Sequence, residues 1–126
     1  MNTLNLNVLV LAYIGDSVYE IYVRKYLIDK GFSNVDDLQK ESIKFVSAKS
    51  QASFLYKMID DDFLLESEKS IYHRARNYKS NRHPKNTDIV TYKVATGLEA
   101  IIGDHFLNDD NDRINEIMNY ILGSDK

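Results

Sequence analysis

The amino-acid sequence predicts an all-α domain, and three observations support this class. Apolar residues recur at three- to four-residue spacing along most of the chain of 126 residues, as they do on the buried faces of helices. No stretch of useful length alternates apolar and polar residues, as a half-buried strand would. The single proline, Pro84, lies in a polar segment typical of a loop between two helices. Because the length is that of one ordinary domain, we expect a single helical domain over residues 1–126.

The first helix is expected over residues 7–30. Asn5 or Asn7 can cap its N-terminus, and Gly31 can end it. Its first two turns are apolar on all sides, which is typical of a central buried helix. Gly15 in its interior costs about 1 kcal/mol relative to alanine. We therefore expect another helix to approach the chain closely at Gly15.

Later helices follow from the same periodicity and from their end signals. Asp36 and Asp37 suit the positive N-terminal end of the second helix, and Gly123 can stop the last. In the third helix, Arg74 and Arg76 are expected to face outward. We expect five to seven helices in all, the later ones spanning about residues 36–59, 64–77, 87–107 and 113–122.

The composition excludes several classes of protein. With 44% hydrophobic and 28% charged residues, the chain is of the globular type and not of the disordered type. It has no cysteine, which excludes disulfides and thiolate metal sites, and its three histidines lack the spacing of a zinc motif. No stretch approaches the roughly 20 apolar residues of a membrane helix, and the N-terminus lacks the basic region of a signal peptide. We expect a cytoplasmic protein that does not enter a membrane.

Two acidic residues lie in apolar helical segments with glycines close by: Asp16 in LAYIGDSVYE and Glu99 in TGLEAIIG. Carboxylates rarely enter a core unless something compensates their charge. Two such residues, far apart in sequence, suggest that the fold brings them together around a cation. Hard oxygen ligands without a cysteine or histidine cluster indicate Mg²⁺ or Mn²⁺. The alternative, in which each acid is a partly exposed flank residue or pairs with a lysine or arginine, stays open.

A basic segment lies within this acidic chain. The whole chain has 16 basic and 19 acidic residues, but the segment 71–87 has five basic residues and no acidic one. A locally basic strip can bind phosphates even when the net charge is negative, and its asparagine, serine and tyrosine side chains can add hydrogen bonds. The composition favours contact with a nucleic-acid backbone over reading of bases. The alternative is an ordinary solvated surface strip.

The motifs IGDSVYE, SAKSQA, RNYKS, PKNTD and LEAIIG, in this order, resemble the catalytic domain of the ribonuclease III family, and more closely its short Mini-III branch. The resemblance covers nearly the whole chain. It implies an all-α, ribonuclease III catalytic-domain-like helical bundle. It also implies a homodimeric, Mg²⁺-dependent endoribonuclease that cuts double-stranded RNA and leaves 5′-phosphate and 3′-hydroxyl ends.

By this resemblance, Asp16 and Glu99 are the catalytic and metal-binding residues and hold one or two Mg²⁺ ions, with Mn²⁺ as a substitute. Most members of the family carry further acids at the positions of Leu9, Ala12 and Thr96, which the Mini-III branch lacks. Water and RNA phosphates are therefore expected to complete the metal shell. Glu20, one turn after Asp16, is interpreted as helix surface.

The resemblance also implies how RNA is held. We expect no double-stranded-RNA-binding domain here, so RNA is expected to be held by the catalytic domain itself, by the dimer and by the loop 73–85. The expected substrate is precursor 23S ribosomal RNA in a bacterial cytoplasm, with ribosomal proteins as further candidate partners. Lys79 and Lys85 are expected to contact phosphates. The secondary candidates for RNA binding are Arg74, Arg76, Asn77, Arg82 and His83.

Two other functions remain open at this stage. The chain could be a non-catalytic RNA-binding or ribosome-assembly module on the same helical fold, since it lacks the additional acids. It could also be a helical interaction protein with no role in nucleic-acid binding, although that leaves the basic segment unexplained. Retention of both Asp16 and Glu99 favours the nuclease.

Overall fold

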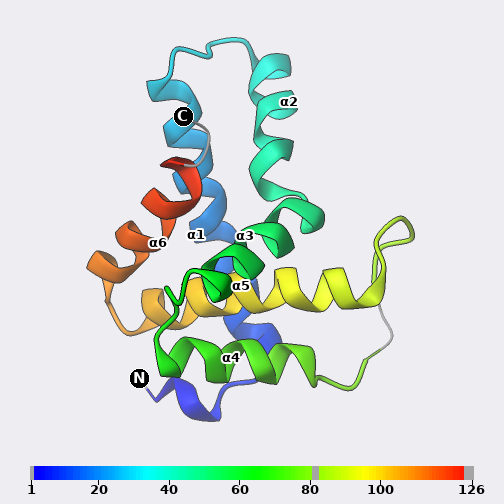
Figure 1. The fold of residues 1–126 in the computed structure, drawn as a ribbon. Coiled ribbons are helices and arrows are strands. Elements are labelled where there is room, and N and C mark those ends of the chain that lie inside the picture. The colour runs from blue at the N-terminus through cyan, green and yellow to red at the C-terminus, as the bar shows by residue number, and fades with distance from the viewer. Residues whose placement is uncertain (1, 81–82, 124–126) are drawn as a thin grey trace.

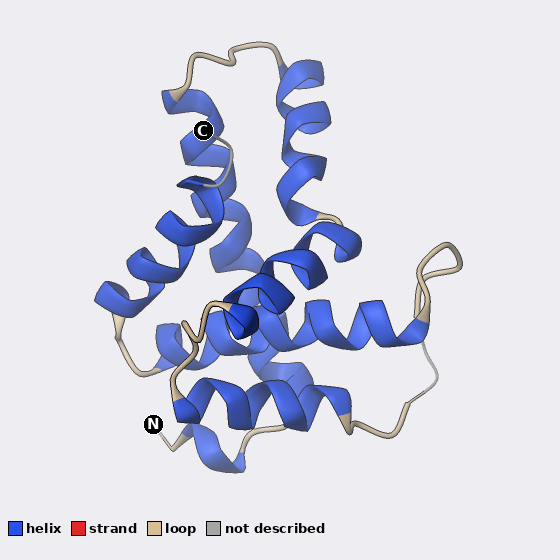
Figure 2. Cartoon of the chain, viewed as in Figure 1, coloured by secondary structure: helices blue, strands red, loops and turns tan. Residues whose placement is uncertain are grey.

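The computed structural model describes residues 2–80 and 83–123, and these contain six α-helices, one short 3-10 helix and no strand (Figure 2). The predicted all-α class is therefore confirmed. The helices are η1 (Thr3–Asn5), α1 (Val8–Asp29), α2 (Val35–Val46), α3 (Ala48–Asp60), α4 (Glu66–Arg76), α5 (Ile89–Leu107) and α6 (Asn111–Gly123).

The ends of α1 and α5 follow the predicted signals. The side chain of Asn7 caps α1 by accepting a hydrogen bond from the N–H of Leu9 at 2.8 Å. Gly31, which follows α1, has a φ of 106°, a conformation that glycine adopts without a steric cost. Asp88 caps α5 by accepting a hydrogen bond from the N–H of Thr91, also at 2.8 Å.

The predicted single helix over 36–59 is wrong, because the chain breaks at Ser47 into α2 and α3. The backbone of Ser47 is extended, with φ −64° and ψ 150°. Its N–H still donates to the carbonyl of Ile43, which ends α2, while its hydroxyl accepts from the N–H of Ser50, which starts α3. The periodic apolar residues continue on both sides of this cap, which is why periodicity alone did not reveal the break.

Helices α1 and α5 form the centre of the molecule, with α5 running across α1 (Figure 1). Gly15 of α1 lies against the backbone carbonyl of Glu99, and Gly103 of α5 lies against the carbonyl of Leu11. A Cβ atom at either glycine would collide with the opposing main chain. The close helix approach predicted at Gly15 is confirmed.

The hydrophobic core surrounds this crossing. Helix α4 packs beside α5, while α3 covers another side of it (Figure 1). The fully buried large side chains come from α1, α3, α5 and α6, and they are Leu11, Tyr19, Leu27, Leu55, Met58, Leu98, Ile101, Ile102, Ile114, Ile117, Met118 and Ile121. In the part of the chain that the structure describes, no helix has the length and apolarity needed to cross a bilayer.

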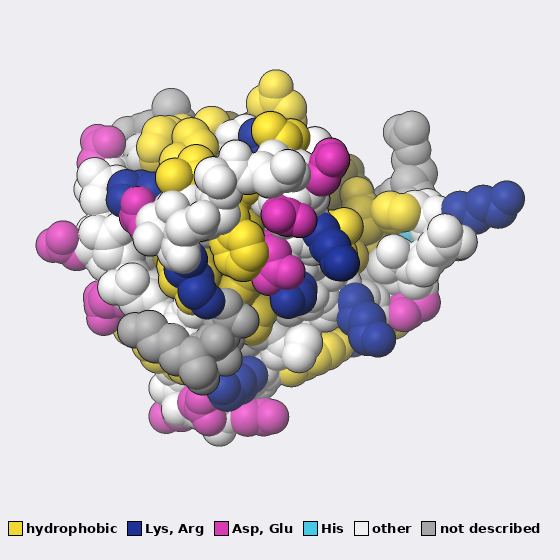
Figure 3. Space-filling model, turned by 90° about the horizontal axis from the view of Figure 1, so that it is seen from above, with side chains coloured by type: hydrophobic (Ala, Val, Ile, Leu, Met, Phe, Trp, Pro, Cys, Tyr) yellow, Lys and Arg dark blue, Asp and Glu magenta, His cyan; other side chains and the backbone are white. Residues whose placement is uncertain are grey.

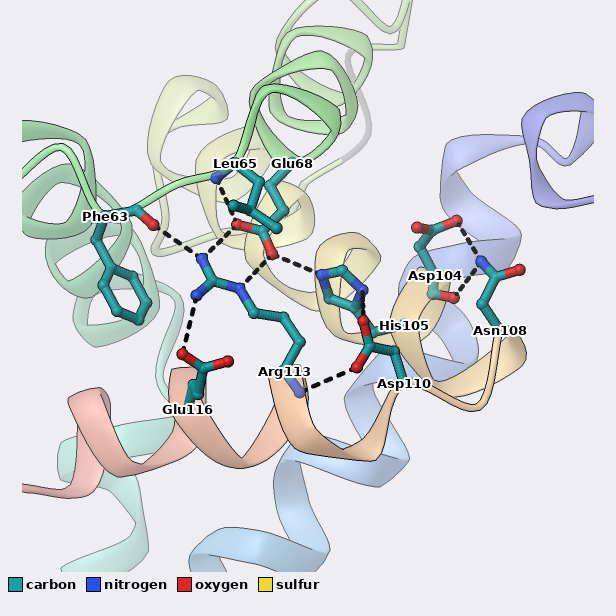
Figure 4. A network of polar contacts seen from close by, with 9 residues as sticks. All are labelled: Phe63, Leu65, Glu68, Asp104, His105, Asn108, Asp110, Arg113 and Glu116. Carbon is teal, nitrogen blue, oxygen red and sulfur yellow. Dashed lines mark hydrogen bonds and ion pairs between the residues drawn. The ribbon is translucent and has the colours of Figure 1, made fainter.

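A buried ionic network joins α4, α5 and α6 (Figure 4). The carboxylate of Glu68 is fully buried and accepts two hydrogen bonds from the guanidinium of Arg113, both at 2.8 Å. His105 Nε2 lies 2.6 Å from the same carboxylate, and the N–H of Leu65 donates to it at 2.8 Å. Burial acts to raise the pKa of Glu68, but the hydrogen bonds from Arg113, His105 and Leu65 outweigh it and lower the pKa to about 2.

Arg113 also holds the loop between α3 and α4. Its guanidinium donates to the carbonyl of Phe63 at 2.8 Å and lies 4.5 Å from the centre of the Phe63 ring. The sequence did not predict this network, because Glu68, His105 and Arg113 come from different helices and share no periodic pattern.

Candidate functional site

The side chains of Asp16 and Glu99 meet beside the crossing of α1 and α5. Gly15 precedes Asp16 and packs on the backbone of Glu99, so the close approach of the two helices brings the acids together. The two carboxyl groups lie near enough to each other for Asp16 to raise the pKa of Glu99. The predicted juxtaposition of these distant acids is therefore present in the fold.

The side chains of Asp16 and Glu99 are less buried than the sequence predicted. Asp16 is exposed to solvent, and Glu99 is half-buried. Position 16 lies on the outer flank of α1, while Leu11 and Gly15 face α5 and are buried. The apolar neighbours of Asp16 in sequence therefore belong partly to exposed faces of the helix. The result is one accessible carboxylate beside one that is partly withdrawn from water.

The surroundings of Glu99 raise the pKa of its carboxyl from 4.5 to about 9. Burial is the main cause, followed by the hydrogen bond and the negative charge of Asp16, and the charge of Glu20 adds to it. A hydrogen bond from Gln51 acts in the opposite direction. Without a cation, a pKa raised in this way favours the neutral form of the Glu99 carboxyl at neutral pH.

Gln51 of α3 is a member of this site that the sequence analysis missed. Its side chain is buried, at 3% exposure, and it acts to lower the pKa of Glu99. A signal was present in the sequence: Gln51 occupies the stripe that continues through Leu55 and Met58, where an apolar residue is expected. A polar residue on the apolar face of a helix requires a buried partner.

Tyr19 lies one turn after Asp16 on α1. It is fully buried, and its hydroxyl donates to the carbonyl of Phe45 at 2.6 Å. Burial raises the pKa of this phenol strongly, and the charge of Glu99 raises it further. Tyr19 is therefore a neutral donor that ties α1 to the last turn of α2.

Glu20 is near the pair but is held by another partner. Its carboxylate lies 3.0 Å from Nε of Arg24, and its side chain is partly exposed. Within the described ranges, no cluster of three or more acidic or histidine side chains could hold a metal ion. A cation at this site would therefore take two protein carboxylates, and its remaining ligands would have to come from water or substrate. Hard oxygen donors of this kind fit Mg²⁺ or Mn²⁺.

The first six residues of the basic segment, 71–76, end helix α4. Residues 77–88 connect α4 to α5 and have no regular secondary structure in their described part, as predicted for the segment around Pro84. The side chains of Lys79 and Lys85 are exposed, as are those of Asn77 and His83. Arg82 lies outside the described residues. The loop projects from the start of α5 (Figure 1). In the space-filling view, a lysine or arginine side chain extends away from the body of the molecule (Figure 3).

The two arginines in the last turns of α4 do not face outward as predicted. Arg74 and Arg76 are both half-buried. The guanidinium of Arg74 donates to the carbonyl of Leu6, which fixes the segment before α1 against α4. The arginine spacing alone could not reveal this long-range acceptor. The exposed cations of the region are thus in the loop and not on the helix.

Comparisons with known proteins agree on one family. The ribonuclease III domain profile matches residues 9–110. The Mini-ribonuclease 3 of Enterococcus faecalis is 42% identical over 93% of this chain and 89% of its own length. That of Staphylococcus aureus is 40% identical over 93% of this chain and 87% of its own length. A crystal structure of a protein from Fusobacterium nucleatum has a TM-score of 0.84 and 35% identity, covering 97% of this chain and 96% of that one.

Proposed function

Since this chain belongs to the ribonuclease III family, we propose that it is an endoribonuclease that cleaves double-stranded RNA with a divalent ion, Mg²⁺ or Mn²⁺, held by Asp16 and Glu99. The family acts on double-stranded RNA, and the relatives named Mini-ribonuclease 3 support the enzyme class. The observation that carries the metal assignment is the meeting of two carboxyl groups, one half-buried, at the crossing of α1 and α5.

The donor set fits a hard divalent cation. Each carboxylate offers oxygen ligands, and a cation between them would offset the burial and the neighbouring charge of Asp16 that raise the pKa of Glu99. When bound, the ion supplies positive charge for the scissile phosphate and lowers the pKa of a bound water. Asp16, which is exposed, reaches the solvent side where RNA would lie, and Glu99 holds the inner side.

A homodimer is the form that suits this surface. On α1, apolar side chains point to solvent at Val10, Tyr13 and Ile21, with exposures of 48%, 82% and 67%. Phe106 of α5 continues this face, and a groove of about 320 Å³ lies between them. Large exposed apolar patches mark interaction sites. We infer that a second copy of the chain covers this face, which would place one acidic site on each strand of a duplex.

The loop 77–88 supplies a second contact with RNA in this proposal. Lys79 and Lys85 are exposed and have no acidic neighbour in the segment 71–87. Double-stranded RNA is recognised mainly through phosphates, 2′-hydroxyls and shape, which suits a projecting basic loop. The biological substrate proposed is precursor 23S ribosomal RNA in the bacterial cytoplasm, with ribosomal proteins as candidate partners.

The test is cleavage of a labelled RNA duplex by the purified protein with Mg²⁺ and with EDTA. We expect 5′-phosphate products with Mg²⁺ and none with EDTA. Asp16→Asn and Glu99→Gln should each abolish cleavage without loss of folding by circular dichroism. Asp29→Asn, which changes an exposed acid at the far end of the same helix, should cut at the wild-type rate.

Two results would contradict the proposal. Cleavage at an unchanged rate by Asp16→Asn or Glu99→Gln would remove these residues from the reaction. Duplex binding without any cleavage in Mg²⁺ or Mn²⁺ would favour the non-catalytic RNA-binding module.

A further inference from the structure

We propose that a cavity beside the acidic pair binds a phosphate of the RNA strand, and that Lys93 of α5 is the residue that contacts this phosphate. The inference rests on the proposed function, because it names a further contact for the RNA that Asp16 and Glu99 would cleave. It adds a residue of a helix to the contacts proposed for the loop 77–88.

The cavity has a volume of about 310 Å³ and lies between α1, α5 and the residues that end and follow α4. This volume is at the lower end of the range for ligand pockets, which is about 300–1,000 Å³. It leaves room for a phosphate with part of its ribose. The lining residues are Leu9 of α1, Ala75, Tyr78 and Ser80 at and after the end of α4, and Tyr92, Lys93 and Thr96 of α5.

The cavity adjoins the acidic pair on both central helices. Thr96 precedes Glu99 by three residues, or about one helical turn, so the two side chains lie on the same side of α5. Leu9 precedes Asp16 by seven residues, or about two turns, and therefore lies on the same side of α1. The first residues of the loop 77–88 line another part of the wall. An RNA strand that runs from this loop to the acids would pass over the cavity.

Lys93 has a partly buried charge and no carboxylate to compensate it. Of the lysines in the described part of the chain, Lys69 and Lys93 are half-buried and the rest are exposed. The ammonium of Lys69 lies 3.2 Å from the carboxylate of Glu66 and 3.8 Å from that of Asp62. Lys93 forms no ion pair or side-chain hydrogen bond within residues 2–80 and 83–123. An anion in the cavity would supply the partner that this charge lacks.

Two tyrosines of the cavity wall add neutral donors. Tyr78 and Tyr92 are half-buried, and neither hydroxyl makes a hydrogen bond in the ranges that the structure describes. The hydroxyls of three other tyrosines are engaged, each donating to another residue: Tyr19, Tyr22 and Tyr120. Phosphate oxygens accept hydrogen bonds from lysine and tyrosine side chains. An ammonium with two hydroxyls therefore suits a phosphate of the RNA backbone.

Nothing in the described wall opposes an anion. None of the lining residues is acidic. The two most buried of them, Ala75 and Thr96, are 1% and 7% exposed, and the Thr96 hydroxyl already donates to the carbonyl of Tyr92 at 2.9 Å. The cavity thus has a neutral, satisfied inner part and a single positive charge at Lys93.

The experiment measures binding of a labelled RNA duplex by fluorescence anisotropy at several salt concentrations, with EDTA present so that the RNA is not cut. Lys93→Gln removes the charge, and Lys93→Met is a second uncharged variant in case the first does not fold. One lost phosphate contact should lower the slope of log affinity against log salt by about 1. Lys93→Arg keeps the charge and should retain the wild-type slope.

A second measurement locates the phosphate. In a series of duplexes, one phosphate at a time is replaced by an uncharged methylphosphonate. One replacement should weaken binding by the wild type but not by Lys93→Gln, because the variant has already lost that contact. This phosphate should lie next to the bond that is cut with Mg²⁺, since the cavity begins about one turn from Glu99 on α5.

Lys69→Gln is the matched control. It removes the other half-buried lysine, whose charge is already compensated by Glu66 and Asp62, so the salt slope should stay at the wild-type value. Thermal unfolding shows whether each variant is folded.

The outcomes distinguish this inference from the proposed function. An unchanged slope in both uncharged variants, an equal fall in Lys69→Gln, or the absence of a phosphate whose effect depends on Lys93 overturns only the role of Lys93. A slope that falls in Lys93→Gln and is retained in Lys93→Arg supports the contact, and it does so even if no duplex is cut with Mg²⁺ or Mn²⁺, a result that overturns the proposed catalysis alone. A wild-type protein that binds no duplex overturns both.

Discussion

Gly15 of α1 faces the carbonyl of Glu99 of α5 at main-chain contact, with no room for a side chain between the two helices. Gly103 repeats the arrangement one turn further along α5, against the carbonyl of Leu11. The two acids of the candidate site are thus brought together by a contact between backbones.

Gly15→Ala is expected to destabilise the protein severely. The added Cβ would overlap the carbonyl of Glu99, so the two helices would have to separate and expose core surface. Overpacking commonly costs about 1–3 kcal/mol, and we expect the upper end or more here. Urea unfolding measures the change. Gly123→Ala is the control, because a Cβ there meets no atom within 4 Å, and equal stability of the two variants would contradict the proposed packing.

Acid should unfold the protein partly through Glu68. Its pKa falls from 4.5 to about 2 on folding, so its contribution to stability is fully present above pH 4.5 and is lost as the pH falls toward 2. The loss amounts to about 3 kcal/mol for this buried carboxylate. Unfolding free energies measured from pH 6 to pH 2 should show this slope in the wild type and a shallower one in Glu68→Gln. An equal pH dependence of the unfolding free energy in the wild type and in Glu68→Gln would contradict the lowered pKa of Glu68.

In the metal-free protein, Glu99 should have the opposite effect. Its pKa is raised to about 9 on folding, so the stability it contributes is present below pH 4.5 and is lost as the pH rises toward 9. Glu99→Gln stays neutral and should be more stable than the wild type at pH 8, by about 1–3 kcal/mol, with the difference vanishing near pH 4. Mn²⁺ should stabilise the wild type alone. Thermal unfolding with EDTA or Mn²⁺ measures both effects, and a pH-independent difference would count against the shifted pKa.

The apolar face of α1 should govern oligomeric state. Ile21→Glu places a charge in the face that we assign to a second copy, so we expect a monomer by light scattering where the wild type is a dimer. Val35→Glu is the matched control, since Val35 is equally exposed but lies on α2. Two results would contradict this assignment of the face to a second copy: a wild-type protein that is monomeric at micromolar concentration, or an Ile21→Glu variant that remains a dimer.

The loop lysines should act on RNA affinity and not on catalysis at saturation. The double variant Lys79→Ala, Lys85→Ala removes two phosphate contacts, so the slope of log affinity against log salt should fall by about 2. Binding of a non-cleavable duplex at several salt concentrations measures it. Lys40→Ala, an exposed lysine of α2, should leave the slope unchanged. An unaltered slope in the double variant would exclude the loop from phosphate contact.

The sequence could predict what periodicity and glycine placement encode. The helical class, the approach at Gly15 and the meeting of Asp16 with Glu99 all follow from apolar stripes and from polar residues placed within them. Each of these features can be inferred from the residues of a single helix or from a pattern that repeats along it.

Other features depend on hydrogen-bond partners that no local sequence pattern identifies. Ser47 caps α3 with its own hydroxyl and so breaks a continuous apolar stripe into two helices. Arg74 finds its acceptor in Leu6, 68 residues away, and Arg113 finds Glu68 at a separation of 45. Asp16 is exposed because it lies on the outer flank of α1. Its apolar neighbours in the sequence do not reveal this exposure.

Main-chain contact at Gly15 and Gly103 also sets what the site can tolerate. The separation of α1 and α5 beside Asp16 and Glu99 is set by the contact between their two main chains. The separation of the two helices at this point therefore depends on the absence of a side chain at Gly15 and Gly103. A redesign of metal preference would therefore have to leave Gly15 and Gly103 unchanged, because a Cβ atom at either position would collide with the opposing main chain.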